Sequence, residues 1–435
     1  MSEKKRVAFI TLGCKVNTSE TEGMKRLFQK AGYETVPEDE YADVYIVNTC
    51  TVTSMSDKKS RQMLRRAHSL NPQAIVAAVG CFAQVSPDEA AKIPGVNLVV
   101  GNNMKHQIVE LVENVAGDRP VTLVNERKSL SVYEELPVEA YDGHTRAFLK
   151  IQDGCDQFCS YCIIPYARGP VRSRSLEDVI HEAEGFAQRG YKEVVLTGIH
   201  LTSYGDDKNG AGLGDLIYRI HDIEGIERIR LGSLEPMFLT MDFIQRIKSL
   251  PKFCPHFHIS LQSGCERTLR RMNRKYTPED YRGIVKALRE HIPDVTLTTD
   301  IMVGFPGETE EDFLESYRFC EEMEFLWIHV FKYSPRKGTP AAKYPDQVDA
   351  AIKDQRSRDM IALAERMRER IFGQYIGREM SVLMEQPIKG SPRDMEGLTA
   401  NYIPVAVEVE NPCAGEIIKT RLLSIEGERM RGTLD

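Results

Sequence analysis

Three cysteines stand close together in the segment Cys155-Asp-Gln-Phe-Cys159-Ser-Tyr-Cys162. Thiolates are soft ligands that suit iron–sulfur clusters, and three of them can hold three corners of a four-iron cubane while one iron stays open. Structural zinc sites instead use a closed set of four ligands, commonly in pairs. A chance cluster, or a zinc site with a remote fourth ligand, is the alternative. The spacing favours a reactive iron–sulfur centre.

The composition is that of a soluble globular protein. The chain has 435 residues, ten cysteines and a net charge of −7, and its length is typical of about three domains. We interpret Val7–Leu12 as a first β-strand rather than a signal sequence, because six apolar residues are too few. No apolar run approaches the roughly 20 residues of a bilayer span. We therefore expect a cytoplasmic protein with reduced thiols, metal binding and no membrane contact.

A second set of three cysteines follows three predicted strands. Cys14 follows the strand-like run Val7–Leu12, Cys50 follows Val44–Val47, and Cys81 follows Ala74–Val79. Helical patterns alternate with these strands, from Ser19 to Ala31 and around Asp57–Ser69, which predicts a parallel sheet. The carboxyl ends of parallel strands meet at one edge of a sheet, where ligands bind. Buried structural cysteines are the alternative, but a second cluster is the favoured interpretation.

A second strand–helix series begins after a poorly periodic connection at residues 118–142. Its strand-like runs are Ala147–Gln152, Glu193–Ile199, Arg228–Leu234, His256–Gln262, Val295–Val303 and Leu326–Tyr333. Helical patterns include Leu176–Gln188, Pro278–Arg289 and Ala350–Phe372. Six such units predict a partial (β/α)6 barrel, whose active site lies at the carboxyl ends of the strands. The cysteine loop follows the first of them.

The last part of the chain changes to short alternating runs after Gly377. Met380–Met384, Tyr402–Val409 and Glu416–Leu423 are such runs, with turns between them, and they predict a small all-β barrel. The predicted fold class is therefore α/β: an N-terminal open parallel sheet, a central partial barrel and a small C-terminal all-β barrel.

Basic residues gather in three places despite the acidic total. They are Lys58, Lys59, Arg61, Arg65 and Arg66; Arg168, Arg172 and Arg174; and Arg267, Arg270, Arg271, Arg274 and Lys275. Each cluster could be an ordinary solvated face. Together they predict a basic surface that could neutralise nucleic-acid phosphates.

Eight short motifs resemble those of the methylthiotransferase family of radical S-adenosylmethionine (SAM) enzymes. They are Thr11–Asn17, Asn48–Val52, Gly80–Gln84, Asp153–Cys162, Ile164–Gly169, Thr197–His200, His258–Gly264 and Asp300–Glu308. The resemblance covers nearly the whole chain. It implies three domains: a methylthiotransferase domain over 4–116 with the second cluster, a radical SAM core over 141–371, and a TRAM-like RNA-binding domain over 374–435.

Residues near the first and third cysteines indicate a branch of this family. Leu12, Lys15-Val16-Asn17 and Phe82 look most like the branch that acts on N6-threonylcarbamoyladenosine of tRNA. The resemblance then implies conversion of this base, next to the anticodon, to its 2-methylthio derivative. The alternatives are isopentenyladenosine in tRNA, whose branch usually has Gln-Met-Asn there, and an aspartate of a ribosomal protein, whose branch usually has Pro-Lys-Asn. An electron carrier or RNA-binding scaffold without turnover is the rival from another class.

The resemblance also implies cofactors and partners. Two 4Fe-4S clusters would be held by Cys155, Cys159 and Cys162 and by Cys14, Cys50 and Cys81, and SAM would be radical source and methyl donor. SAM contacts are expected from Tyr161, Thr197, Gly198, Ser233, Glu235, Gln262, Gly304 and Gly307. The expected partners are a tRNA anticodon stem-loop and a low-potential electron donor such as flavodoxin or ferredoxin. We expect a monomer.

Overall fold

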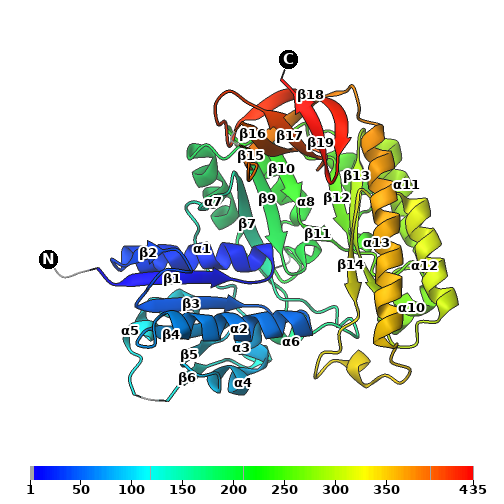
Figure 1. Cartoon of the computed structure of the whole chain (residues 1–435). Helices are drawn as coiled ribbons and strands as arrows, with labels where there is room; N and C mark the ends of the chain where they lie inside the picture. The colour runs from blue at the N-terminus through cyan, green and yellow to red at the C-terminus, as the bar shows by residue number, and fades with distance from the viewer. Residues whose placement is uncertain (1–3, 118, 209, 392, 435) are drawn as a thin grey trace.

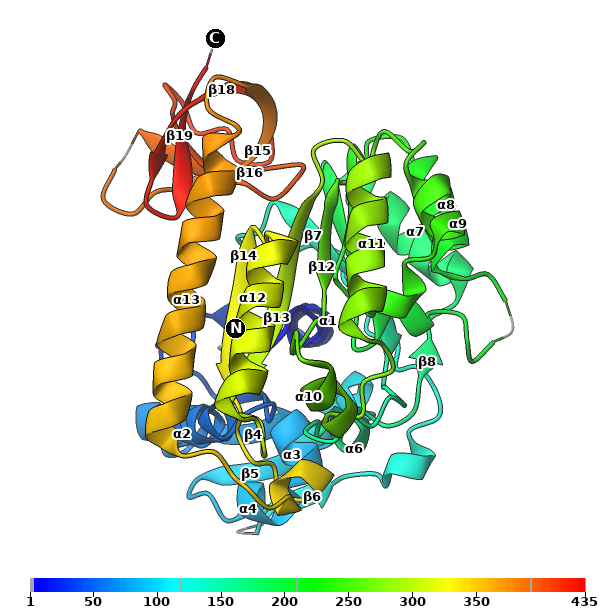
Figure 2. The ribbon, with the colours of Figure 1, turned by 90° about the vertical axis from the view of Figure 1, so that its right-hand side faces the viewer.

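The computed structural model describes residues 4–117, 119–208, 210–391 and 393–434, which form three units (Figure 1). The N-terminal unit and the small C-terminal unit lie at opposite ends of the large central one (Figures 1 and 2). No helix in these ranges is both long and apolar enough to cross a membrane.

The N-terminal unit is a six-stranded, wholly parallel sheet in the order β2-β1-β3-β4-β5-β6. The strands are β1 Arg6–Thr11, β2 Glu34–Val36, β3 Val44–Thr49, β4 Ile75–Gly80, β5 Val96–Val100 and β6 Val121–Leu123. The open parallel sheet predicted from the sequence is confirmed. Its last strand lies within the segment expected to be a connection.

Helices cover both faces of this sheet because its central strands carry apolar residues on both faces. Alternate strand residues enter two separate cores: Val7 and Phe9 pack with helices on one face, and Ala8 and Ile10 pack with helices on the other. The helices are α1 Lys15–Lys30, α2 Ser54–Leu70, α3 Cys81–Val85, α4 Pro87–Ala91 and α5 Ile108–Glu113, with 3-10 turns at η1 Lys105–Gln107 and η2 Arg127–Ser129.

Helix α1 begins four residues before the expected start at Ser19. Cys14 is its N-cap residue, so Lys15 occupies the first turn. The apolar periodicity begins only at Met24, because the first two turns bury polar side chains such as Asn17 and Glu20 instead. This early start places Lys15 directly beside the first cysteine.

The central unit is a partial barrel in which six successive strand positions run parallel. Its strands are β7 Arg146–Asp153, β9 Glu193–Gly198, β10 Arg228–Leu231, β11 Ser233–Leu234, β12 His256–Ile259, β13 Thr296–Val303 and β14 Trp327–Lys332. The short β8 (Arg172–Ser173) pairs antiparallel with β7. The run predicted as Arg228–Leu234 is divided at Gly232 into β10 and β11, which belong to different four-stranded sheets.

Eight helices belong to this unit in the described ranges. They are α6 Ile164–Arg168, α7 Leu176–Gln188, α8 Leu213–His221, α9 Met241–Ile247, α10 Glu266–Arg271, α11 Pro278–His291, α12 Glu310–Met323 and α13 Ala350–Gly373, with 3-10 turns η3 Leu201–Ser203, η4 Pro236–Phe238 and η5 Pro340–Lys343. One large apolar core joins all of these helices except α6 to the strands. Thr277 and Thr309 cap α11 and α12, each with an aspartate three residues later that completes a capping box.

The C-terminal unit is a closed five-stranded barrel in the order β15-β16-β17-β19-β18, as predicted. The strands are β15 Glu379–Pro387, β16 Asp394–Thr399, β17 Pro404–Glu408, β18 Ile417–Glu426 and β19 Arg429–Thr433. Two arginines of β10 hold it on the central barrel. Arg228 Nη1 donates to Leu398 O at 2.9 Å, and Arg230 Nη1 donates to Ala400 O at 3.0 Å.

The N-terminal unit is held on the central barrel at the other end. Arg336, in the segment after β14, donates to Asp57 Oδ2 of α2 at 2.7 Å and to Thr51 Oγ1 at 2.7 Å. On the far side, Glu20 of α1 pairs with Lys150 of β7 at 2.8 Å. The carboxyl ends of the N-terminal strands are thereby brought to the mouth of the partial barrel.

Candidate active site: two three-cysteine sites beside neighbouring cavities

Cys155, Cys159 and Cys162, here called the loop site, lie in the connection between β7 and α6. The chain turns sharply at Gly154, which has φ +77° and whose added Cβ would lie 1.8 Å from Pro170 O. Cys155 N–H donates to Gly169 O at 3.0 Å, and Cys162 N–H donates to Cys159 O at 2.9 Å. The backbone therefore determines the shape of this loop, in which the sequence predicted a metal site.

The thiols of the loop site influence one another. Burial, with a contribution from the neighbouring Cys159, raises the pKa of Cys155 to about 12 and that of Cys162 to about 12. These two thiols stay protonated at neutral pH unless a cation stabilises the thiolates, as iron does. The site thus has the chemistry of a metal-binding site rather than of a free reactive cysteine.

An arginine completes the loop site. Arg274 Nη1 donates to Cys159 Sγ at 3.2 Å. Its Nη2 donates to both carboxylate oxygens of Glu235, at 2.9 and 2.8 Å. Glu235, which was expected to contact SAM, is therefore ion-paired behind the loop site, although 23% of its side chain stays exposed.

Cys14, Cys50 and Cys81, here called the strand-end site, follow the neighbouring strands β1, β3 and β4. Desolvation raises the pKa of Cys14 although the residue borders a cavity, and Cys81 adds to this against the opposing charge of Arg168. Burial also raises the pKa of Cys50, with contributions from Cys81 and Cys14. The three strand ends thus bring these thiols together, as the sheet topology predicted.

Neither site fits a single zinc ion. Zn–S bonds of about 2.3 Å in a tetrahedron place sulfurs about 3.8 Å apart. Within the described ranges, no group of three cysteine sulfurs lies within 4.8 Å of one another. Each set is therefore too widely spaced for one tetrahedral ion, yet close enough for mutual electrostatic effects. Sets of cysteine thiolates are also the ligands of iron–sulfur clusters, which contain several metal ions.

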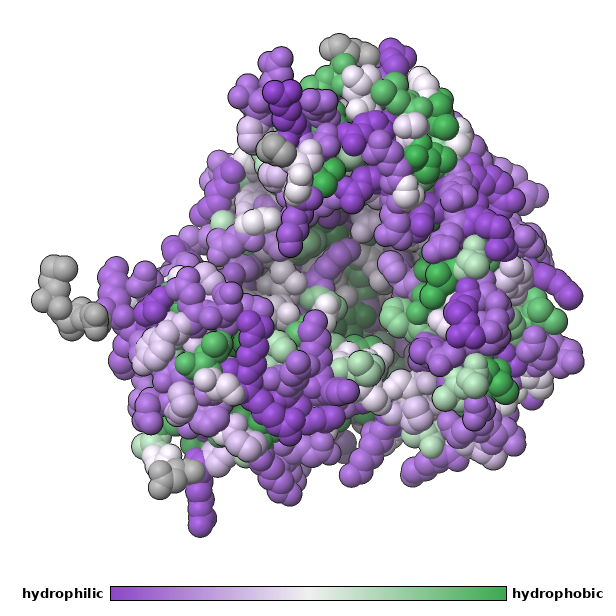
Figure 3. Space-filling model, viewed as in Figure 1, coloured by the Kyte–Doolittle hydropathy of each residue, from purple (hydrophilic) through white to green (hydrophobic). Residues whose placement is uncertain are grey.

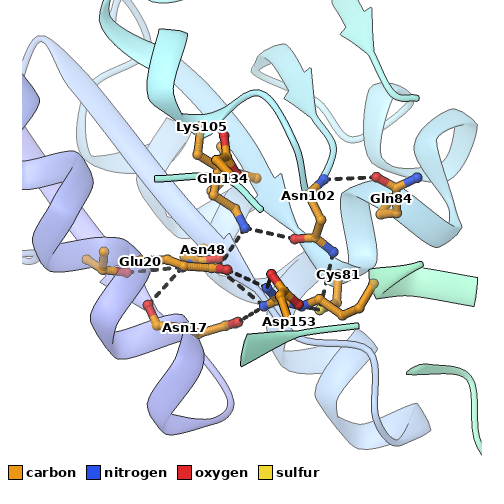
Figure 4. Close-up of polar contacts among 12 residues, drawn as sticks. Asn17, Glu20, Asn48, Cys81, Gln84, Asn102, Lys105, Glu134 and Asp153 are labelled. Atoms are coloured by element: carbon orange, nitrogen blue, oxygen red, sulfur yellow. Dashed lines mark hydrogen bonds and ion pairs between the residues drawn. The ribbon is translucent and has the colours of Figure 1, made fainter. Parts of the chain in front are cut away.

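A buried ion network joins the strand-end site to the central barrel (Figure 4). Arg168 of α6 donates from Nε to Cys81 Sγ at 3.2 Å and from Nη2 to Asn17 Oδ1 at 2.6 Å, and it pairs with Glu20. Asn102 Nδ2 also donates to Cys81 Sγ, at 3.6 Å. The arginine that contacts the strand-end site therefore comes from the helix after the loop site.

Glu20 is the centre of this network. It is fully buried and also pairs with Lys105 at 2.6 Å and Lys150 at 2.8 Å. Burial alone would raise the pKa of Glu20, but Arg168, Lys105 and Lys150 hold it well below its ordinary value. Asp153, beside the loop site, also accepts from Lys150 at 2.9 Å. The charged groups fix α1 against β7 and α6.

Two neighbouring cavities lie beside the two sites. A cavity of about 460 Å³ reaches Cys14 of the strand-end site, and one of about 180 Å³ reaches Cys162 of the loop site. Asp300 of β13 lines both cavities. The larger cavity lies in the hollow among the three units that is visible in Figure 3.

The expected SAM contacts divide among several places. Tyr161 and Gln262 line the smaller cavity with Cys162, while Thr197, Gly198 and Ser233 line the larger one. Gly304 and Gly307 lie in the turn after β13 with φ +70° and +76°. Added Cβ atoms there would meet Lys353 Cγ at 2.3 Å and Arg271 Nη2 at 2.7 Å. A close approach of protein side chains accounts for both glycines.

The prediction of a basic surface is wrong for one of the three clusters. Arg168, Arg172 and Arg174 are buried, with Arg172 donating to Leu130 O and Arg174 pairing with Glu182. In the third cluster, Arg274 is buried against Glu235, while Arg267 and Arg270 are largely exposed. Lys58, Lys59, Arg65 and Arg66 of α2 are exposed, so this helix carries the basic surface that was predicted.

Several site residues were not singled out as site residues in the sequence. Arg168 lies in the motif Ile164–Gly169, and Asp300 begins the motif Asp300–Glu308, so both motifs carried a signal. Arg274 carried only its charge. Its role depends on a contact with Cys159, which lies far away in the chain.

Two family profiles match the chain: the Radical SAM superfamily over residues 149–320, and Uncharacterized protein family UPF0004 over residues 6–101. Threonylcarbamoyladenosine tRNA methylthiotransferase MtaB of Bacillus subtilis is 42% identical over 421 residues, 96% of this chain and 93% of that protein. A tRNA-2-methylthio-N(6)-dimethylallyladenosine synthase of Moorella thermoacetica is 36% identical over 440 residues, 99% of this chain and 98% of that protein.

A solved structure shares the fold. The radical S-adenosylmethionine methyltransferase TsrM from Kitasatospora setae aligns with a TM-score of 0.57 at 16% identity, covering 78% of this chain and 77% of that one. The three-cysteine loop at the mouth of a partial barrel, together with identity to methylthiotransferases over nearly the whole length, shows that this chain is an enzyme of the radical SAM methylthiotransferase family.

Proposed function

We propose that this enzyme methylthiolates tRNA, converting N6-threonylcarbamoyladenosine next to the anticodon to its 2-methylthio derivative. The observation that carries the proposal is the pair of three-cysteine sites beside cavities that share Asp300. Identity to relatives named for this base, at 37–42% over most of the chain, supports the choice of substrate.

We assign a 4Fe-4S cluster to each three-cysteine site. Cys155, Cys159 and Cys162 would hold the cluster that binds SAM, and Cys14, Cys50 and Cys81 the second cluster. When bound, these groups supply the one-electron chemistry, sulfur and methyl group that acid–base side chains cannot supply at an unactivated C–H bond. The raised thiol pKa values and the wide sulfur spacing support this assignment.

The chain's own residues position these groups and their ligands. Arg274 and Arg168 each donate to one cysteine sulfur, which orients that ligand and offsets thiolate charge.

Tyr161 and Gln262 border the cavity beside Cys162. That cavity, about 180 Å³, is smaller than the roughly 300–1,000 Å³ of most ligand pockets, so we propose that SAM extends past Asp300 toward Thr197, Gly198 and Ser233. Glu235, Gly304 and Gly307 are the weaker candidates for contact with SAM.

The tRNA anticodon stem-loop would lie across the hollow among the three units. The exposed lysines and arginines of α2, on the N-terminal unit, supply positive charge for phosphates. From Ile371 onward the chain has seven basic and ten acidic residues, so the C-terminal barrel contributes shape more than charge. The proposed domains span residues 4–116, 141–371 and 374–435. We propose that the protein is a cytoplasmic monomer and that it takes electrons from a flavodoxin or ferredoxin.

Nucleoside mass spectrometry of tRNA from a strain that lacks this protein tests the proposal. We expect loss of 2-methylthio-N6-threonylcarbamoyladenosine and its return when the gene is restored. Loss of the isopentenyl analogue instead would show the other tRNA substrate, for which the 36% identical relative is named. Unchanged tRNA nucleosides, with loss of a methylthio-aspartate from a ribosomal protein, would show the protein substrate.

A further inference from the structure

The larger cavity receives residues from all three units of the molecule. The N-terminal unit supplies Cys14 and Lys15, the central barrel supplies Ser233 and His258, and the C-terminal barrel supplies Tyr402. Its volume of about 460 Å³ is in the range of small-ligand pockets. The cavity therefore has room for a modified base beside the strand-end site.

Lys15 stands apart from the other cations near this cavity. It is the first residue of α1, it is exposed, and no hydrogen bond or ion pair to it occurs among the described residues. Arg230, in the same cavity wall, is already held by Glu193 at 2.7 Å and by Ala400 O at 3.0 Å. Lys15 is thus the cation that remains available to an anionic ligand.

The first turn of α1 strengthens this preference for an anion. Residues 13–16 all line the cavity, so the amino-terminal end of a 16-residue helix faces it. A helix amino terminus favours negative charge through its dipole and its free N–H groups. The ammonium and the helix end are independent features, and both favour an anionic group at the same place.

The rest of the cavity offers flat and polar surfaces rather than a second free cation. His256 stacks on Tyr402, with ring centroids 4.2 Å apart and planes 11° apart. Burial, followed by the charge of Arg230, holds the pKa of His256 well below its ordinary value, so the ring is neutral. Elsewhere in the lining, His258 Nε2 lies 3.3 Å from Asp300 Oδ2. The lining of the cavity therefore includes one acid, Asp300, as well as the cationic Lys15.

We propose that Lys15 binds the carboxylate of the threonylcarbamoyl group and so selects this base against one with a neutral isopentenyl group. The inference rests on the proposed function, because the threonyl carboxylate is the anion that distinguishes the two bases. An isopentenyl group would cover the ammonium without pairing it, which makes that complex unfavourable. Lys15 is a specificity-determining residue in this scheme and takes no part in bond breaking.

Binding of three otherwise identical anticodon stem-loops to the reconstituted enzyme without reductant tests the proposal. The loops carry N6-threonylcarbamoyladenosine, its carboxyl methyl ester, or N6-isopentenyladenosine. We expect the enzyme to bind the free acid about tenfold or more tighter than the ester, as a charged hydrogen bond implies. Lys15→Gln should remove most of this ratio and Lys15→Arg should keep most of it. Lys286→Gln, on the exposed side of α11, is the control.

Equal binding of acid and ester by the unmodified enzyme would overturn the proposal, as would an unchanged ratio in Lys15→Gln. Iron content is measured for each variant because Lys15 adjoins Cys14. If Lys15→Gln loses iron, the acid–ester comparison in the unmodified enzyme and in Lys15→Arg decides. A separate arm adds SAM and reductant: absence of methylthiolation of the free acid by the unmodified enzyme contradicts the proposed function itself.

Discussion

The loop site and the strand-end site each present three cysteines, but the chain builds them differently. Cys155, Cys159 and Cys162 lie within eight successive residues, whose turn depends on Gly154 and on backbone hydrogen bonds to Gly169 and Met272. The strand-end site draws its cysteines from the ends of three strands of one sheet. The cysteines of the first site are therefore neighbours in the sequence itself, while those of the second come together only when the sheet has formed.

The two sites also differ in how an arginine reaches them. Arg274 reaches Cys159 within the central barrel. Arg168 belongs to the central barrel as well, but it reaches Cys81 of the other unit and is fully buried there with Glu20. Completion of the strand-end site thus depends on the docking of two units, which the loop site does not need.

Removal of one set of thiols is the strongest test of this independence. We expect about eight irons per chain in the reconstituted enzyme and about four after Cys155→Ala, Cys159→Ala and Cys162→Ala together, assuming two four-iron clusters. Methylthiolation should fall to background, because SAM loses its binding site. The reciprocal triple substitution at Cys14, Cys50 and Cys81 should also leave about four irons. Unchanged iron in either variant would contradict the assignment of that site.

Loss of Arg168, which connects the two units, should destabilise the protein more than loss of Arg274, which lies within the central barrel. Arg168→Gln leaves a buried carboxylate short of a partner, which costs about 3–5 kcal/mol. Arg274→Gln should cost less, because the Glu235 side chain stays 23% exposed and can be hydrated. Urea unfolding of both variants measures the difference. Equal shifts, or a larger one for Arg274→Gln, would contradict the comparison.

Glycine substitutions can perturb each site separately. Gly154→Ala and Gly80→Ala each force a side chain onto a residue with positive φ, where added Cβ atoms meet Pro170 O at 1.8 Å and Asn48 Oδ1 at 2.5 Å. We expect a loss of about 1–3 kcal/mol for each from strain, with iron lost only from the neighbouring site. Gly190→Ala is the matched control, with φ +85° and open space around the added Cβ. Iron loss in the control would show that strain alone is responsible.

The smallest expected effect concerns RNA binding beside the strand-end site. Helix α2 follows Cys50 and exposes Lys58 and Lys59. The double alanine substitution should weaken tRNA binding and reduce the slope of log affinity against log salt by about two, roughly one per lost phosphate contact. Lys248→Ala with Lys286→Ala is the control pair, because these lysines lie on the central barrel, just after α9 and on α11. Equal slopes of log affinity against log salt for the two double variants would show that α2 does not contact tRNA.

The sequence predicted those parts of the molecule that depend on local spacing. The loop site follows from three cysteines in eight residues, and α7 has the bounds that its apolar periodicity predicted. The strand-end site could be predicted because cysteines after consecutive parallel strands must meet at one sheet edge. The division of the third barrel strand at Gly232 and the strands β16 and β19 were not predicted, since their patterns are short and packing decides them.

The tertiary structure alone decided which charged residues are buried and which are exposed. Arg168, Arg172 and Arg174 read as a surface cluster, yet they are buried because their partners lie on other elements. Lys15 lies before the predicted helix and was noted only as a residue that indicates the family branch, and only the meeting of three units leaves it facing a cavity. Spacing along the chain determines which thiols can share a cluster, but burial and pairing of a charge depend on residues that are distant in sequence.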